Sequence, residues 1–206
     1  MSRARRRLLF PLFVAALLMT GTAVSQLAAH MGHCCAEAVT CRPINFITRE
    51  DCLISAGQTL PRLENGDILI TCSTHSFGWR HGHAGLVVDE TRGLVLEAQI
   101  LGSPSSVVPA EHWRRYSTLW VFRLKNVQPE VRQAIADYAL RTLNHIPYRL
   151  TSGWFGRRAD GCLSVQCAYL VWYAYAHFGF DLDSDGGRLV TVADLAASPL
   201  LEVVEE

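Results

Sequence analysis

The chain has 206 residues, of which 50% are hydrophobic, and its 19 basic and 19 acidic side chains balance to a formal net charge of zero. A protein that binds nucleic acid by neutralising phosphates is expected to carry a basic excess, so the composition argues against that class. A small or neutral substrate fits this charge better. The length allows one domain with a sizeable core.

The N-terminus combines a basic stretch with a short apolar run, which is the pattern of a secretory signal peptide. Four arginines among residues 3–7 precede the apolar residues 8–19, and Ala23-Val24-Ser25 offers a cleavage site. The run is shorter than the roughly 20 residues of a spanning helix. We therefore expect export to the periplasm, the cell envelope or the extracellular space, and membrane association only if the signal stays uncleaved.

Cysteine usage agrees with an oxidising compartment, where disulfides are favoured. The chain has seven cysteines, so at least one thiol lacks an intramolecular partner. The residue pattern divides the chain into a signal peptide over 1–25, a cysteine-rich arm or linker over 26–60, and a main domain over 61–206. The cysteines are Cys34, Cys35, Cys41, Cys52, Cys72, Cys162 and Cys167.

Strand patterns come first along the main domain, and helix patterns follow. Two β-rich runs joined by a few polar residues and a glycine predict a hairpin over 83–99. Apolar residues at helical spacing predict helices over 129–143 and 167–178. We also expect a short helix over 44–55, strands over 68–71 and 118–124, and an exposed loop over 73–82. This order predicts an α+β fold with an antiparallel sheet packed against a helix.

Cys167 stands out because it lies at the start of the second predicted helix, with Ser164 as the expected N-cap. The positive end of the helix dipole would stabilise a thiolate there, and the thiolate is the attacking form of cysteine. Backbone N–H groups of the same turn would donate to an oxyanion. Cysteine on an apolar helix face is also common in cores, so position alone leaves both interpretations open.

His83 and Glu97 are the side chains that would activate such a nucleophile. Alternation places His83 and Gly85 on one face of the hairpin, and pairing across Asp89–Gly93 sets Glu97 opposite Gly85. Gly85 would leave room for that carboxylate to reach the imidazole, fix its tautomer and stabilise the imidazolium. Gln99 is the competing orienting group, because the register decides which side chain faces His83.

Four motifs in this order resemble those of the YiiX-type (YebB-like) hydrolases, circularly permuted relatives of the NlpC cell-wall peptidases with a papain-like fold. The resemblance spans about Gly66 to Val204, including the tail over 181–200. In papain the cysteine precedes the histidine in the chain, whereas here the histidine comes first, as permutation implies. The motifs are Gly66-Asp67-Ile68-Leu69, Gly82–Val88, Leu96-Glu97-Ala98 and Cys167–Tyr175.

The resemblance implies a permuted papain-like fold with Cys167 as nucleophile, His83 as base and Glu97 as the polar third member. It also implies that Tyr148 lines the site and binds substrate, with a structural tyrosine as the alternative. The expected enzyme is a cysteine amidase or peptidase acting on a small amide or peptide, with peptidoglycan as a candidate. No cofactor and no metal are expected.

Two departures from the family pattern concern residues outside this catalytic scheme. Ala168 stands where the family usually has serine after the nucleophile, and Ala193 stands where a proline is common.

Three other interpretations stay open. A lipid acyltransferase of the lecithin retinol acyltransferase type, or a phospholipase, would use the same cysteine beside apolar surface at Trp113, Trp154 and Phe155. A non-catalytic binding module would follow if Cys167 were locked in a disulfide, with Cys162 nearby. A zinc site would use residues of the right types whose spacing matches no common structural pattern, namely Cys72, His75, His81 and His83.

Overall fold

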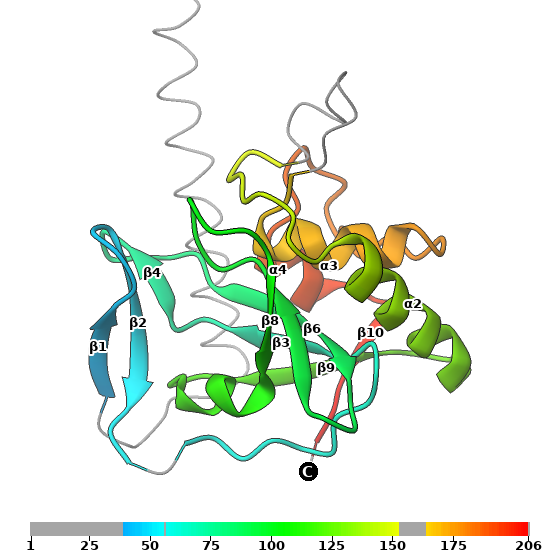
Figure 1. The fold of residues 1–206 in the computed structure, drawn as a ribbon, viewed down its shortest axis with the longest axis horizontal. Coiled ribbons are helices and arrows are strands. Elements are labelled where there is room, and N and C mark those ends of the chain that lie inside the picture. Colours follow the sequence, from blue (N-terminus) through cyan, green and yellow to red (C-terminus); the bar gives the residue numbers. More distant parts are fainter. Residues whose placement is uncertain (1–38, 56, 153–163, 206) are drawn as a thin grey trace, which may run out of the picture.

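The structure, a computed structural model, describes residues 39–55, 57–152 and 164–205. Figure 1 shows a small sheet, a larger sheet and two main helices following one another across the molecule. Within the described part, no helix has the length and apolar character needed to cross a bilayer. The predicted signal peptide, Cys34, Cys35, Cys162, Trp154 and Phe155 lie outside the described residues.

The larger sheet has six strands in the order β10-β9-β3-β6-β7-β8, and every neighbouring pair is antiparallel. The predicted strands over 68–71 and 118–124 and the predicted hairpin are confirmed, and so is the α+β class with an antiparallel sheet. The strands are β3 (Ile68–Thr71), β6 (His83–Asp89), β7 (Leu94–Glu97), β8 (Ser106–Pro109), β9 (Trp120–Leu124) and β10 (Leu201–Val203).

This sheet is buried on both faces. Successive side chains of a strand point to opposite sides, so each face has its own hydrophobic cluster. One face, with Ile70 and Leu86, joins the core formed with α2 (Pro129–Thr142) and α3 (Cys167–Ala176). The other face carries Leu69, Val87 and Val95 and packs against the 3-10 helix η1 (Ala110–Arg115). Each fully buried leucine or isoleucine contributes about 1.5–3 kcal/mol, so both faces stabilise the sheet.

The helices also start largely where the sequence predicts. Pro129 occupies the first turn of α2, where its missing N–H is not needed. The predicted N-cap of α3 is wrong, because Gln166 takes this position in place of Ser164 and its side chain accepts from the Ala168 N–H. A short α4 (Val192–Ala197), with a capping box at its start, lies between α3 and β10.

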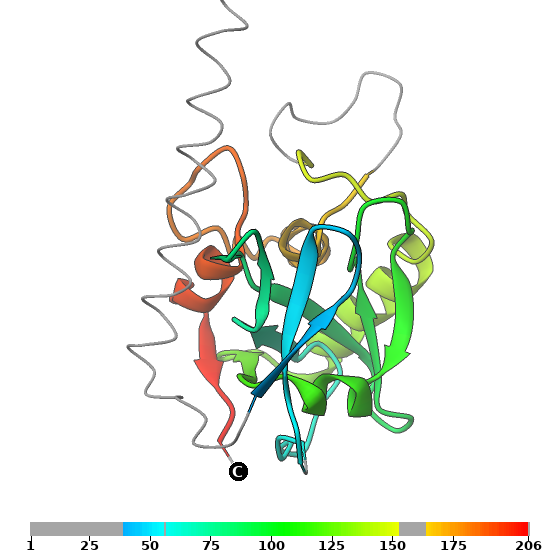
Figure 2. The ribbon, with the colours of Figure 1, turned by 90° about the vertical axis from the view of Figure 1, so that its left-hand side faces the viewer.

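The smaller sheet contradicts two expectations, since residues 44–55 form no helix and residues 73–82 are not simply a loop. Asn45 Oδ1 accepts hydrogen bonds from the N–H groups of Ile47 and Thr48, the latter at 2.6 Å. These bonds close a turn, after which β2 begins. Figure 2 shows this hairpin in front of the larger sheet. The strands are β1 (Val39–Pro43), β2 (Thr48–Leu53), β4 (Thr74–Ser76) and β5 (Trp79–Arg80).

Pairing between β2 and β4 joins the N-terminal hairpin to the main domain, with Thr48 opposite Ser76. The expected boundary at residue 60 stays a prediction, but the described end of the arm shares a sheet with residues beyond it. This matters for the site, because β2 contributes a buried side chain to it.

Candidate active site

Three candidate residues lie at the ends of three elements that meet. His83 is the first residue of β6, Glu97 is the last of β7, and Cys167 is the first of α3. His83 Nε2 lies 3.0 Å from Glu97 Oε2, and the two residues are only 3% and 6% exposed. The competing Gln99 points elsewhere, because its Nε2 donates to Glu50 Oε1 at 3.2 Å. The hairpin thus presents a histidine–carboxylate pair.

The register agrees with the prediction at the site and differs from it at the turn. Glu97 stands opposite Gly85 as predicted, whereas Asp89 pairs with Leu94 and not with Gly93. An irregularity after Val87 absorbs one residue, as β-bulges do near functional sites.

Gly85 serves a different purpose from the one predicted. A Cβ there would lie 2.6 Å from Trp113 Cζ2. The missing side chain of Gly85 therefore makes room for the indole of Trp113 and not for the Glu97 carboxylate. The Trp113 ring stacks on the His83 ring, with centroids 4.9 Å apart and planes 10° from parallel. Trp113 itself is 1% exposed, so it does not form the apolar surface expected for a lipid substrate.

Gly85→Ala is therefore expected to reduce the free energy of unfolding by about 1–3 kcal/mol, the usual cost of overpacking. Urea unfolding would measure it. In a Trp113→Phe background the atom Cζ2 is absent, so Gly85→Ala should reduce the free energy of unfolding by less. Equal costs in both backgrounds would show that Trp113 does not account for this glycine.

Cys167 is half-buried and lies close enough to His83 to raise the pKa of its imidazole. Because Glu97 occupies Nε2, the other ring nitrogen remains for the thiol. Cys167 Sγ also lies 3.5 Å from Gln166 Oε1. Cys167 forms no disulfide with another described cysteine.

Electrostatics at His83 favour its charged form. Burial lowers the pKa of His83, but hydrogen bonds with Cys167 and Glu97, together with the negative charges of both, outweigh burial and raise the pKa to about 10. The surroundings of His83 therefore favour the imidazolium over the neutral imidazole.

This shift predicts how stability depends on pH. The pKa of His83 is about 10 in the folded protein, against an ordinary value of 6.5, so folding favours the proton between these values. The stabilisation is complete below pH 6.5 and is lost as the pH rises through 10. Urea unfolding at a series of pH values should show that the free energy of unfolding falls over this window. The fall should be smaller in Glu97→Gln. Parallel curves would contradict the assignment.

One wall of the candidate site is formed by a buried carboxylate that the sequence analysis did not predict. Glu50 of β2 is 1% exposed and accepts hydrogen bonds from Tyr116 Oη (2.6 Å) and Arg115 Nη2 (3.0 Å). Burial raises the pKa of Glu50, but these hydrogen bonds and the charges of Arg115 and His83 lower it overall. The Tyr116 ring also packs edge-on against Trp113, with centroids 5.5 Å apart, which links this wall to the histidine.

Gln166 was also missed, and it changes the expected oxyanion donors. Its Oε1 accepts from the Ala168 N–H at 2.9 Å, while its Nε2 donates to the Val190 carbonyl at 2.7 Å. The Ala168 N–H is therefore already engaged. The Cys167 N–H, at the first position of the helix, has no hydrogen-bond acceptor among the described residues.

Tyr148 lies beside the nucleophile, because residues 147–149 bridge to Val165 two positions before Cys167. Burial raises the pKa of the Tyr148 phenol, and the negative charge of Cys167 adds to this. Tyr148 is half-buried, so a role in substrate binding stays a prediction.

The zinc ligands considered from the sequence do not gather. His81 is bonded to Ser76 Oγ (3.1 Å) and to the Gly82 carbonyl (2.9 Å), and burial raises the pKa of the Cys72 thiol to about 12. Among the described residues, two other groups bring metal-binding atoms together, namely Cys41, Asp51 and His75, and Asp183, Asp185 and Asp194.

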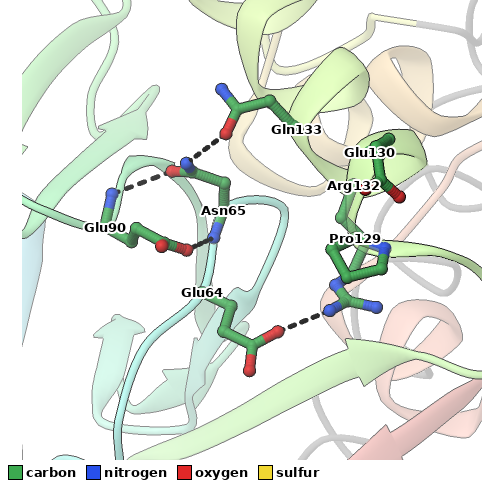
Figure 3. Close-up of a pocket in the computed structure, with 7 residues that line it drawn as sticks. All are labelled: Glu64, Asn65, Glu90, Pro129, Glu130, Arg132 and Gln133. Carbon is green, nitrogen blue, oxygen red and sulfur yellow. Dashed lines mark hydrogen bonds and ion pairs between the residues drawn. The ribbon is translucent and has the colours of Figure 1, made fainter.

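A surface pocket of about 320 Å³ lies elsewhere, beside the start of α2 (Figure 3). Its polar groups bond one another: Asn65 Nδ2 donates to Gln133 Oε1 at 2.6 Å, and Arg132 pairs with Glu64. None of the three candidate catalytic residues lines it. We therefore place the candidate site at the meeting of β6, β7 and α3.

Comparison with solved structures shows a likeness in fold. No model of a known protein family matches the chain, and no curated protein matches it. A crystal structure of YiiX from Escherichia coli O157:H7, described as a metalloprotein with the domain DUF1105, superposes with a TM-score of 0.55 at 18% sequence identity. The match covers 71% of this chain and 98% of YiiX. The chain therefore has a YiiX-like α+β fold.

Proposed function

We propose that the chain is an exported cysteine hydrolase, an amidase or peptidase with a permuted papain-like arrangement of Cys167, His83 and Glu97. One observation carries the proposal: His83, bonded to Glu97 through Nε2, and Cys167 are the first residues of β6 and α3, two elements that pack together. Nucleophile, base and orienting group in series are what nucleophilic acyl transfer needs. Export is proposed from the N-terminal signal pattern.

The proposed reaction starts from a thiolate–imidazolium pair, in which His83 already holds the Cys167 proton and Glu97 stabilises the imidazolium. The thiolate attacks the carbonyl carbon, and the C=O π electrons move to oxygen to give a tetrahedral oxyanion. His83 then protonates the leaving nitrogen as the C–N bond breaks, which leaves an acyl group on the sulfur. Water, deprotonated by His83, hydrolyses this thioester and restores the enzyme.

The oxyanion would be stabilised at the start of α3. The Cys167 N–H is the proposed donor, because Gln166 already engages the Ala168 N–H. The helix dipole adds to this stabilisation, since its positive end lies at the first residue. Tyr148 is a proposed substrate contact, which its position beside Cys167 supports.

A metal-dependent reaction is the second candidate, because YiiX is described as a metalloprotein. A chelating site needs donor atoms that converge on one point. The donor atoms of Cys167, His83 and Glu97 do not all lie within 4.8 Å of one another, as the described convergent groups do. We therefore propose that chemistry at Cys167 uses no metal.

The test offers the full chain two substrate pools, cell-wall-type peptides and phospholipid vesicles, and identifies the products by mass spectrometry. We expect a peptide to be split into a free carboxylate and a free amine by the native chain and by Cys52→Ala, but not by Cys167→Ala. Acyl transfer between lipids would favour the acyltransferase alternative. Equal products from Cys167→Ala would exclude this cysteine as the nucleophile.

A further inference from the structure

A second group of reactive side chains lies in the small sheet, and each member comes from a different strand. Cys41 lies in β1, Asp51 in β2 and His75 in β4. Cys41 pairs directly with Asp51, and His75 pairs with Arg49, two residues before Asp51. The sheet register therefore brings a thiol, a carboxylate and an imidazole together, and their ligand atoms all lie within 4.8 Å of one another.

The way these groups meet differs from the arrangement at His83. In the small sheet both contacts use the same ring nitrogen: His75 Nε2 lies 3.9 Å from Cys41 Sγ and 3.1 Å from Asp51 Oδ1. A proton relay needs two different nitrogens, as proposed for His83. One neutral nitrogen either donates or accepts, so it cannot donate to the carboxylate and also accept from the thiol. A cation at the common point would satisfy all three groups.

The separations fit a tetrahedral ion. Zinc bonds of about 2.3 Å to sulfur and about 2.0–2.1 Å to nitrogen and oxygen imply separations of roughly 3.5 Å for S···N and roughly 3.3 Å for N···O. The observed values are 3.9 Å and 3.1 Å. A thiolate, an imidazole and a carboxylate are also ligand types that zinc accepts, whereas calcium and magnesium prefer oxygen alone.

The surroundings of the group also suit an ion. Arg80 pairs with Asp51 Oδ2, which leaves Oδ1 facing His75. Such outer-shell hydrogen bonds commonly fix the orientation of a ligating carboxylate. Cys41 is exposed, so solvent can provide the fourth ligand.

We propose that Cys41, Asp51 and His75 form a zinc site that ties β1 and β2 to β4. It departs from our expectation of a protein without metal, and it does not depend on the proposed hydrolase function. Because Glu50, next to Asp51, bonds Arg115 and Tyr116, the ion would also stabilise the strand that forms one wall of the candidate active site.

The test measures zinc binding to the full chain, reduced and freed of metal, by competition with a chromogenic chelator. We expect one ion bound by the native chain, and affinities lower by more than about 100-fold in Cys41→Ala and His75→Ala, beyond the effect of losing an outer-shell partner. Cys52→Ala and His112→Ala should bind as the native chain does. Ligand variants that keep the native affinity would overturn the proposal.

A second measurement does not depend on how well the variants fold. Zinc should protect Cys41 of the native chain from iodoacetamide, as peptide mapping would detect, and cobalt(II) in its place should give a sulfur-to-metal charge-transfer band. An unchanged rate of Cys41 alkylation with saturating zinc would overturn the proposal even if the variants fail to fold. Neither readout involves turnover at Cys167, so this site and the proposed hydrolase can fail separately.

Discussion

Cys167→Ala is expected to reduce kcat/KM by at least about 10⁴-fold, because alanine offers no nucleophile and no acyl-enzyme can form. The fold should survive, since Cys167 is half-buried and alanine already occurs at buried positions 168 and 174 of α3. Steady-state kinetics on a peptide identified by the substrate pools would measure the loss, and urea unfolding would confirm that stability is kept.

The matched control is Cys52→Ala, which removes another free thiol from β2 without touching the triad. Its kcat/KM should stay within about threefold of the native value, within the usual effect of a modest stability change. If Cys167→Ala and Cys52→Ala lost activity equally, general destabilisation would explain the result, and the nucleophile would have to be sought elsewhere.

His83→Ala is expected to have the second largest effect, a loss of about 10³–10⁴-fold in kcat/KM, because it removes the general base and the imidazolium that stabilises the thiolate. The rate at which iodoacetamide alkylates Cys167 at pH 7 should fall by more than about tenfold, because an unassisted cysteine is only a few per cent thiolate at that pH.

Glu97→Gln separates orientation from charge at the same histidine. The amide still accepts a hydrogen bond from His83 but carries no negative charge. Glu97→Gln should therefore lower kcat/KM by less than His83→Ala does. The rate of Cys167 alkylation, measured as a function of pH, would compare the effects of Glu97→Gln and His83→Ala without any substrate. An alkylation rate in His83→Ala equal to that of the native chain would show that His83 does not activate this thiol.

Local patterns predicted the central part of the fold. Alternation and the polar turn at 90–93 gave the β6–β7 hairpin, and apolar spacing with Pro129 gave α2. These elements form from contacts close in sequence, so a single chain reveals them. The same patterns predict that His83 and Glu97 share one face of the hairpin.

The joining of the two hairpins into the small sheet could not be predicted this way, because β2 pairs with β4 across a long stretch of sequence. Thr48 lies opposite Ser76, and no local signal points to that pairing. Glu50 was missed for the same reason. Its neighbours suggested a short helix, while its burial depends on Arg115 and Tyr116, about 65 residues away in the chain.

The site was predictable where a residue's role follows from its chemistry and not where it follows from packing. Cys167 and His83 carry groups that few other residues provide. Trp113 takes its place only because Gly85 leaves space over β6, and Gln166 caps α3 with a side chain that ranks low among usual N-caps. Such packing and capping roles depend on tertiary geometry.

The central claim is that Cys167 carries the acyl group, and trapping that intermediate tests it most directly. The full chain would be mixed with the peptide and lipid pools, quenched in acid within the first turnover, and weighed intact and after proteolysis. The account predicts a thioester-linked acyl adduct on the peptide that contains Cys167, with none in Cys167→Ala and a strongly reduced amount in His83→Ala. An adduct on another residue, or turnover without any adduct on Cys167, would contradict it.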